Sequence, residues 1–330
     1  MKRLLICALV VTLCAGVIQA QGDAPELPPA PGVMVDVGGY SLHLNCTGEG
    51  GPTVVMDAGH GDFSLSLGPL QQQIAEFVPV CTFDRAGYGW SDEGPEPRDS
   101  QQNADELKAL LENAGEEAPY ILVGHSLGGI NAILFAAENP ELVAGVVLLD
   151  SSHPDQMELL NAEVPEIVAI EDMTAGVYQS LLDLAEQGAL TADMVAELRP
   201  QGMSDADFET WAPLYIQAKN LRAMVAEYGL LDESLAEAGE NGDLGSIPLV
   251  VIAHGALLKD LLPAEALEAL GLTPELLDTY EALWRGLQED HLNRSTDSTL
   301  IVAENSPHYV YVYEPELAVE AIQGLVEGAQ

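Results

Sequence analysis

Short, continuous apolar runs alternate along this chain with longer segments whose apolar residues recur every three or four positions. Continuous runs of this kind are typical of strands buried on both faces, and the wider spacing is typical of amphipathic helices. The expected strands are Thr53–Asp57, Val80–Phe83, Tyr120–Val123, Val143–Leu149, Pro248–Ala253 and Thr299–Ala303. The expected helices are Leu67–Phe77, Arg98–Ala114, Leu127–Glu138, Leu257–Leu292 with a break near Gly271, and Pro315–Leu325. The alternation predicts an α/β fold in which a mostly parallel sheet is flanked by helices.

One long segment departs from this alternation. Residues 151–245 have no strand pattern and contain 19 acidic residues against 3 basic ones. We interpret this segment as a helical cap inserted between two parts of a core, residues 33–150 and 246–330. Some of its apolar residues are candidates to line an apolar substrate channel, namely Trp211, Leu214 and Tyr215.

The first twenty residues have the pattern of a targeting segment. Met1-Lys2-Arg3 precedes an apolar run from Leu4 to Ala20, and a polar, Pro-rich linker over residues 21–32 follows. This pattern predicts a secretory signal peptide, residues 1–20, cleaved near Ala20, and therefore export to the periplasm or the medium. A retained N-terminal membrane anchor is the alternative, because the run approaches spanning length. We expect no membrane span in the mature chain.

The charge balance limits the partners. The 330 residues include 53 Asp and Glu against 11 Lys and Arg, a formal net charge of −42. Eleven cations are too few to build a basic face for DNA or RNA, so we expect no nucleic-acid partner. The chain has no P-loop, no G-x-G-x-x-G after a strand and no His/Cys/Asp cluster at metal-ligand spacing, so we expect no cofactor and no metal.

Two cysteines, Cys46 and Cys81, remain after signal cleavage, and both belong to strand-like runs. Val33–Val37 and Tyr40–Cys46, separated by Gly38-Gly39, predict a hairpin, and Cys81 lies in the strand predicted near residue 80. In an exported protein Cys46 and Cys81 can form a disulfide if their strands are neighbours. Two buried free thiols are the alternative.

The strongest chemical signal is Gly124-His125-Ser126-Leu127-Gly128, a G-x-S-x-G sequence. An apolar strand precedes it and a small-residue helix follows it. This strand–turn–helix setting predicts a nucleophile elbow, in which Ser126 adopts a strained backbone conformation and projects its hydroxyl above the sheet edge. The alternative is a serine that caps the helix beginning at Leu127.

With these motifs the chain resembles the α/β-hydrolase superfamily, and the resemblance extends over Val33–Cys46, Thr53–Asp150 and Ile247–Leu325. It implies an α/β-hydrolase fold with an inserted cap. In that fold the second and fourth strands are adjacent, which favours a Cys46–Cys81 bridge. The matching stretches are Val54-Val55-Met56-Asp57-Ala58-Gly59-His60-Gly61, Asp84-Arg85-Ala86-Gly87-Tyr88-Gly89-Trp90-Ser91-Asp92, the elbow, and Ser306-Pro307-His308.

A serine nucleophile needs a base, and His308 is the first candidate among seven histidines. It follows the last predicted strand and precedes the last helix, where the resemblance places the catalytic histidine. An ordinary loop histidine is the alternative. The other histidines considered for this role have weaker claims: His43, His125, His153, His254 and His291.

A carboxylate must orient that histidine, and its position is ambiguous. Most members of the superfamily take it from just after the strand that follows the insertion, where Asp260 is the nearest acid in this chain. A minority take it from the end of the strand after the nucleophile helix, which is Asp150 here. We favour Asp150, with Asp260 as the alternative acid and Asp155 as a more distant third candidate.

The oxyanion of the tetrahedral intermediate needs two fixed N–H donors. The resemblance implies the backbone N–H groups of Leu127 and of His60. A serine at the nucleophile position argues against dehalogenase or epoxide hydrolase chemistry, where the resemblance requires an aspartate.

The loop Asp84-Arg85 followed by Gly87-Tyr88-Gly89-Trp90 looks structural. We interpret it as a segment fixed beside the site by an ion pair and an aromatic plug. Contact of Tyr88 or Trp90 with substrate is the alternative.

The predicted function is that of an exported serine hydrolase that cleaves carboxylic esters of small molecules with apolar acyl groups. An acyltransferase or perhydrolase, and a lactonase or amidase, are alternatives that use the same three residues. A non-catalytic ligand-binding member of the fold is an alternative of another class.

Overall fold

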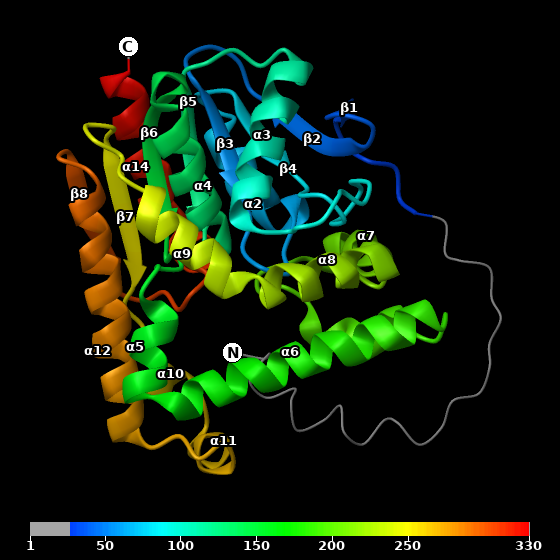
Figure 1. The fold of residues 1–330 in the computed structure, drawn as a ribbon, viewed down its shortest axis with the longest axis vertical. Coiled ribbons are helices and arrows are strands. Elements are labelled where there is room, and N and C mark those ends of the chain that lie inside the picture. The colour runs from blue at the N-terminus through cyan, green and yellow to red at the C-terminus, as the bar shows by residue number, and fades with distance from the viewer. Residues whose placement is uncertain (1–26, 330) are drawn as a thin grey trace.

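The computed structural model describes residues 27–329, and its centre is one eight-stranded sheet (Figure 1). The strand order is β1-β2-β4-β3-β5-β6-β7-β8. Strand β2 is antiparallel to both of its neighbours, and the pairs from β4 to β8 are parallel. The strands are β1 (Val33–Asp36), β2 (Ser41–Thr47), β3 (Thr53–Asp57), β4 (Val80–Phe83), β5 (Tyr120–His125), β6 (Val143–Leu149), β7 (Leu249–His254) and β8 (Ser298–Ala303).

The predicted signal peptide, residues 1–20, lies outside the described residues, as does most of the linker. Within residues 27–329, no helix combines the length and the apolar composition that crossing a bilayer requires.

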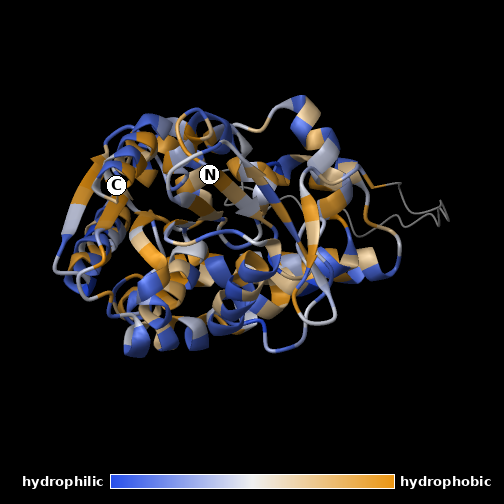
Figure 2. Cartoon of the chain, turned by 90° about the horizontal axis from the view of Figure 1, so that it is seen from above, coloured by the Kyte–Doolittle hydropathy of each residue, from blue (hydrophilic) through white to orange (hydrophobic). Residues whose placement is uncertain are grey.

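Helices cover both faces of the sheet because the central strands are apolar on both faces. Along β3, Val55 packs into an apolar cluster on one face of the sheet, whereas Val54 and Met56 pack into a separate cluster on the other face. Neighbouring side chains of a strand point to opposite faces, so a continuous apolar run needs a cover on each. Figure 2 shows the apolar strands enclosed between the helices. The covering helices are α2 (Ser64–Ile74), α3 (Ser100–Ala114), α4 (Leu127–Glu138), α9 (Leu231–Asn241), α12 (Pro274–Asp290) and α14 (Pro315–Gly328).

Helix α2 begins earlier than the predicted Leu67. Its first residue, Ser64, donates its backbone N–H to Asp84 Oδ1 over 2.9 Å. An acceptor from another part of the chain therefore satisfies one of the free N–H groups at this helix start. Local sequence carries no sign of such a partner.

The segment between β6 and β7 is helical, and most of it lies beyond the carboxyl ends of the strands (Figure 1). Its last helix, α9, packs against α3 and α4 beside the sheet. The cap, meaning the part that covers the strand ends, therefore stops before α9. Trp211, Leu214 and Tyr215 are fully buried in a cluster inside this segment and do not line either of the two cavities described below. The helices of the covering part are α5 (Gln156–Glu163), α6 (Pro165–Glu186), the 3-10 helix η3 (Ala192–Leu198), α7 (Asp205–Tyr215) and α8 (Ala218–Gly229).

A second apolar cluster joins this cap to the chain that follows β7. Leu160 and Ile167 of the cap pack with Leu262 and Leu277. The helices after β7 thus close one side of the cap, which the sequence pattern did not indicate. The shorter elements of the core are α10 (Leu258–Leu261), α11 (Ala264–Ala269), α13 (Val310–Tyr313), and the 3-10 helices η2 (Pro140–Leu142) and η4 (His291–Arg294).

A buried ion network also ties the cap to the core. The Arg85 guanidinium donates to Asp57 Oδ1 over 2.7 Å and to both carboxylate oxygens of Glu227, on α8, over 2.8 and 3.0 Å. The Tyr88 hydroxyl donates to Glu227 over 2.7 Å. The ion pairs that fix this loop are therefore those of Arg85 with Asp57 and Glu227, and Asp84 Oδ2 lies 3.0 Å from a nitrogen of His43. Tyr88 is fully buried and packs with the cap cluster, as a plug would.

Cys46 and Cys81 lie directly opposite each other on β2 and β4, and a disulfide joins them. The bridge closes a loop with a sequence separation of 35 residues, which contains β3 and α2.

Candidate active site

Ser126 occupies a tight turn between β5 and α4. Its φ of 52° and ψ of −121° lie in a region that side chains rarely adopt. The flanking glycines explain how the turn fits. A Cβ at Gly124 would lie 2.3 Å from the carbonyl oxygen of Gly128, and a Cβ at Gly128 would lie 2.5 Å from that of Asp57. The Ser126 side chain makes no capping hydrogen bond to α4, which disagrees with the helix-cap interpretation.

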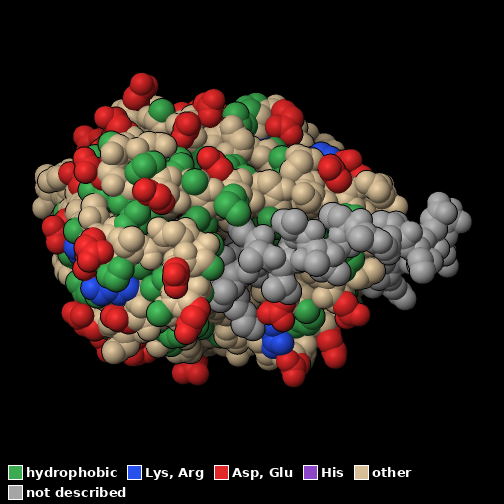
Figure 3. Space-filling model, turned by 90° about the horizontal axis from the view of Figure 1, so that it is seen from below, with side chains coloured by type: hydrophobic (Ala, Val, Ile, Leu, Met, Phe, Trp, Pro, Cys, Tyr) green, Lys and Arg blue, Asp and Glu red, His purple; other side chains and the backbone are tan. Residues whose placement is uncertain are grey.

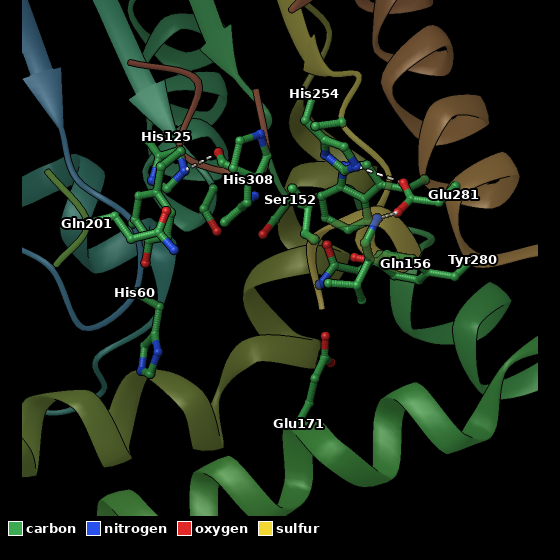
Figure 4. A pocket seen from close by; sticks show the side chains of 18 of the residues that line it. His60, His125, Ser152, Gln156, Glu171, Gln201, His254, Tyr280, Glu281 and His308 are labelled. Carbon is green, nitrogen blue, oxygen red and sulfur yellow. Dashed lines mark hydrogen bonds and ion pairs between the residues drawn. The ribbon is translucent and has the colours of Figure 1, made fainter. Parts of the chain in front are cut away.

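Ser126 opens into a cavity of about 320 Å³ between the sheet and the cap. His308 and His60 line the same cavity, and Figure 4 shows both side chains facing it. A second cavity of about 190 Å³ adjoins Ser126 and Leu127. The two cavities share His60, Ser126, Ser152, Gln156 and Glu171, so they form one continuous lining around the serine.

His308 lies in the loop after β8, and its ring is fixed on two sides. Its Nδ1 lies 2.6 Å from Asp150 Oδ2, and its ring centroid lies 4.5 Å from that of His125. The side chain remains 39% exposed, which leaves it accessible from the cavity. Because Nδ1 is hydrogen-bonded to the carboxylate, Nε2 is the nitrogen available to a proton donor in the cavity.

Asp150 follows β6 directly and is completely buried, with a φ of 45°. Besides His308, its carboxylate accepts hydrogen bonds from Trp284 Nε1 over 3.0 Å and from the backbone N–H of His254 over 3.1 Å. Burial acts to raise the pKa of Asp150, but the charge and hydrogen bond of His254, together with His308, hold the pKa well below its ordinary value. The carboxylate is therefore ionised at neutral pH.

The other two candidate acids lie elsewhere. Asp260, in α10, and Asp155, before α5, are both exposed. Among the described residues, no hydrogen bond or ion pair joins either of them to His308.

His254 has a closer connection to the site than its sequence pattern indicates. It ends β7 next to Asp150, and its Nδ1 lies 2.8 Å from Asp150 Oδ2 while its Nε2 lies 2.9 Å from Glu281 Oε2 (Figure 4). Burial acts to lower the pKa of His254, but the two carboxylates outweigh it and raise the pKa to about 10. The signal in the sequence was its position at the carboxyl end of the strand beside the one that ends at Asp150.

The loop after β3 passes close to the serine. A Cβ at Gly59 would lie 3.1 Å from Ser126 Cβ. The next residue, His60, lines both cavities, and its Nε2 lies 2.8 Å from the Met224 carbonyl oxygen of the cap. Leu127 is the first residue of α4, so its N–H has no partner within the helix.

The remaining histidines have structural surroundings. His125 packs against the rings of Tyr309 and Tyr311, with centroids 5.2 and 5.0 Å away. His291 is fully buried, and its Nε2 lies 3.0 Å from the carbonyl oxygen of Ser152.

One group of side chains outside the serine site has possible metal ligands close together. His153, Asp155 and Asp290 bring ligand atoms within 4.8 Å of one another, a proximity that the sequence spacing did not reveal. Both carboxylates are largely exposed, and exposed acidic groups of this kind commonly occur without an ion.

Comparison with known proteins shows the family to which this arrangement belongs. A model of the alpha/beta hydrolase fold matches residues 59–223, half of the chain. The uncharacterized protein YqjL of Bacillus subtilis is 26% identical over 278 residues, 83% of each chain. The 2-(acetamidomethylene)succinate hydrolase of Mesorhizobium japonicum is 25% identical over 309 residues, which cover 89% of this chain and 94% of that one. The structure of a thermophilic esterase from Thermogutta terrifontis superposes with a TM-score of 0.57 at 19% identity, covering 90% of this chain and 98% of that one. The chain is a member of the α/β-hydrolase fold family and a hydrolase of that superfamily.

Proposed function

We propose that this protein is an exported serine hydrolase that cleaves carboxylic esters, with Ser126 as nucleophile, His308 as general base and acid, and Asp150 as the orienting carboxylate. One observation carries the proposal. Ser126, on its strained turn, lines the same cavity as His308, and His308 Nδ1 is hydrogen-bonded to a buried, ionised carboxylate. Nucleophile, base and orienting acid are the three parts that acyl transfer through a serine requires.

In the proposed reaction the Ser126 oxygen attacks the ester carbonyl carbon while His308 Nε2 takes the hydroxyl proton. Asp150 stabilises the imidazolium that forms. The backbone N–H groups of Leu127 and His60 donate to the oxyanion of the tetrahedral intermediate. Collapse of the intermediate expels the alcohol with the proton from His308, and water activated by the same imidazole then hydrolyses the acyl-enzyme.

Esters are the favoured substrates because an alkoxide leaves more readily than an amine. The Thermogutta terrifontis protein is an esterase and the Mesorhizobium japonicum relative is a hydrolase, which supports hydrolytic chemistry without fixing the substrate. The mixed polar lining of the cavity, with Ser152, Gln156 and Glu171, does not favour a purely apolar acyl group.

The test is hydrolysis of p-nitrophenyl esters of increasing chain length, combined with labelling by a fluorophosphonate probe. The wild-type protein should hydrolyse at least one ester and become labelled, whereas Ser126→Ala should do neither. Labelling of Ser126→Ala, or its unchanged turnover, would refute the nucleophile. Turnover that diverts into a new ester when an alcohol is added would indicate acyl transfer.

The acid assignment is tested by two matched variants. Asp150→Asn keeps the shape of the side chain but removes the charge that orients His308, so kcat should fall by about 10³–10⁴-fold. Asp260→Asn changes an exposed side chain and should leave kcat within about twofold of the wild type. The reverse ranking would show that Asp150 is not the orienting acid.

Export is tested by fractionation of the producing cells and mass analysis of the mature chain. We expect cleavage near Ala20 and protein outside the inner membrane. An intact N-terminus in the membrane fraction would favour the anchor instead.

A further inference from the structure

The carboxylate of Glu171 lines the cavity around Ser126. Glu171 lies on α6, on the same helix face as Thr174 and Tyr178, and this face is turned toward the serine. Figure 4 shows the Glu171 side chain pointing from its helix into the cavity. Among the described residues, no hydrogen bond or ion pair joins this carboxylate to another side chain.

Glu171 is half-buried. Removing an ionised carboxylate from water without giving it a partner is unfavourable. Burial, and to a smaller extent the nearby charge of Asp172, raise the pKa of Glu171 to about 7. A positively charged group in the cavity would relieve this cost, because it would restore the favourable interaction that the ionised carboxylate lacks.

The rest of the lining also favours a cation. The rings of Tyr178 and Tyr228 line the smaller cavity with Glu171, and their centroids lie 5.5 and 5.9 Å from the His60 ring. Aromatic faces attract cations through the negative charge of their π-electrons. None of the residues that the structure describes around the two cavities is a Lys or an Arg.

The other charged groups in the lining already have partners, and Asp62 is among them. Glu227 is held by Arg85, and His254 lies between Asp150 and Glu281. Glu171 is thus the lining carboxylate that could form a new ion pair with a cationic substrate.

The charge of the whole protein acts in the same direction. The sequence has 53 acidic residues against 11 basic ones. On the face shown in Figure 3, carboxylates are scattered widely and Lys and Arg occupy a few small areas. Such a surface attracts cations and repels anions at long range, and salt weakens both effects.

We propose that the preferred esters of this enzyme carry an ammonium group, which binds in the cavity between Glu171 and the rings of Tyr178 and Tyr228. This inference rests on the proposed function, since it assigns the substrate class of the Ser126 site. The carboxylate supplies charge, the rings supply cation–π attraction, and neither requires the ammonium to donate a hydrogen bond.

The test uses pairs of esters that have the same shape and differ only in charge. In one pair, butyrylcholine and 3,3-dimethylbutyl butyrate, the charge is on the alcohol. In the other, the p-nitrophenyl esters of 4-(trimethylammonio)butanoate and 5,5-dimethylhexanoate, it is on the acyl group. In at least one pair, wild-type kcat/KM should be about tenfold or more higher for the cationic ester, and the preference should shrink as salt is added.

Glu171→Gln should reduce the cationic-to-neutral ratio of kcat/KM toward one, because it removes the charge and keeps the shape. Glu166→Gln is the matched control: it lies on the same helix and is exposed, so its ratio should equal that of the wild type. The mono-p-nitrophenyl ester of adipic acid, whose second carboxyl group is free, supplies an anionic comparison that should be the poorest substrate.

The possible failures are distinguishable. If neutral esters are cleaved in a Ser126-dependent way but neither cationic ester is preferred, or if the anionic ester is preferred, the ammonium subsite is wrong and the hydrolase proposal stands. An undiminished preference in Glu171→Gln would also overturn the subsite. If no ester of any charge is cleaved and the probe does not label Ser126, the proposed function itself fails.

Discussion

Replacing His254 by Asn is expected to destabilise the protein by an amount that depends strongly on pH. In the wild type the imidazolium lies between two carboxylates, 2.8 Å from Asp150 and 2.9 Å from Glu281, and its side chain is 9% exposed. Asn can keep a donor near the Nδ1 position, but it removes the positive charge and leaves Glu281 without that partner. Breaking a buried pair in this way costs about 3–5 kcal/mol.

The pH dependence follows from the raised pKa. A histidine with a folded-state pKa of about 10 and an unfolded-state value near 6.5 contributes its full stability below about pH 6.5 and loses it as the pH rises through about 10. The contribution is about 4 kcal/mol at pH 7 and about 2 kcal/mol at pH 8.5. The lowered pKa of Asp150 changes the stability only at acidic pH, where this carboxylate becomes protonated, so it does not affect the comparison of pH 7 with pH 8.5.

The assay is urea unfolding of the wild type and of His254→Asn at both pH values. The gap in unfolding free energy between the two should roughly halve from pH 7 to pH 8.5. His291→Asn is the matched control, because burial holds the pKa of this fully buried histidine well below its ordinary value and the side chain is neutral throughout. Its stability loss should be the same at both pH values. A His254→Asn gap that does not change with pH would show that His254 carries no charge in the folded protein.

The remaining predictions concern the connections within the core and between core and cap. Glu227→Gln leaves the buried Arg85 with one carboxylate partner fewer and should lower the unfolding free energy by about 3–5 kcal/mol in chemical denaturation. Arg222→Gln removes the exposed pairs with Glu93 and Glu186 and should change the unfolding free energy by less than about 1 kcal/mol. Equal effects of the two substitutions would contradict the role of burial. Replacing Cys46 and Cys81 together by Ala should lower the unfolding free energy by about 3–4 kcal/mol, as expected for a closed loop of this length. A reductant should have no further effect on the urea midpoint of this double variant. A double variant as stable as the oxidised wild type would refute the expected loss.

Much of the sheet was predictable from the sequence because its strands are continuous apolar runs. Val143–Leu149 and the helix Leu127–Glu138 have the predicted bounds, since the strand is apolar throughout, the helix is mostly so, and a polar residue follows each. The turn at Ser126 was predictable for a related reason: a strand, a glycine-flanked serine and a helix follow one another directly, so the pattern is local.

The contacts that surround Asp150 were not predictable in the same way. His254 is 104 positions away along the chain, and Glu281 and Trp284 are on a helix further on. Their meeting depends on the pairing of β6 with β7 and on how α12 packs beside them, and no short-range periodicity encodes either. The same holds for Arg85 and Glu227, which are 142 positions apart. Sequence patterns locate elements, whereas the partners of buried charges are decided by how the elements pack.

The Arg85 network has a consequence for any attempt to exchange the cap between relatives. A graft that replaces the inserted segment and keeps the recipient sheet would exchange the surface and the pocket lining together. It would leave the buried Arg85 guanidinium with Asp57 as its remaining carboxylate partner unless the donor segment carried an acid at the position of Glu227. A chimaera of this protein is therefore expected to be more stable when the exchanged segment keeps a carboxylate at this position.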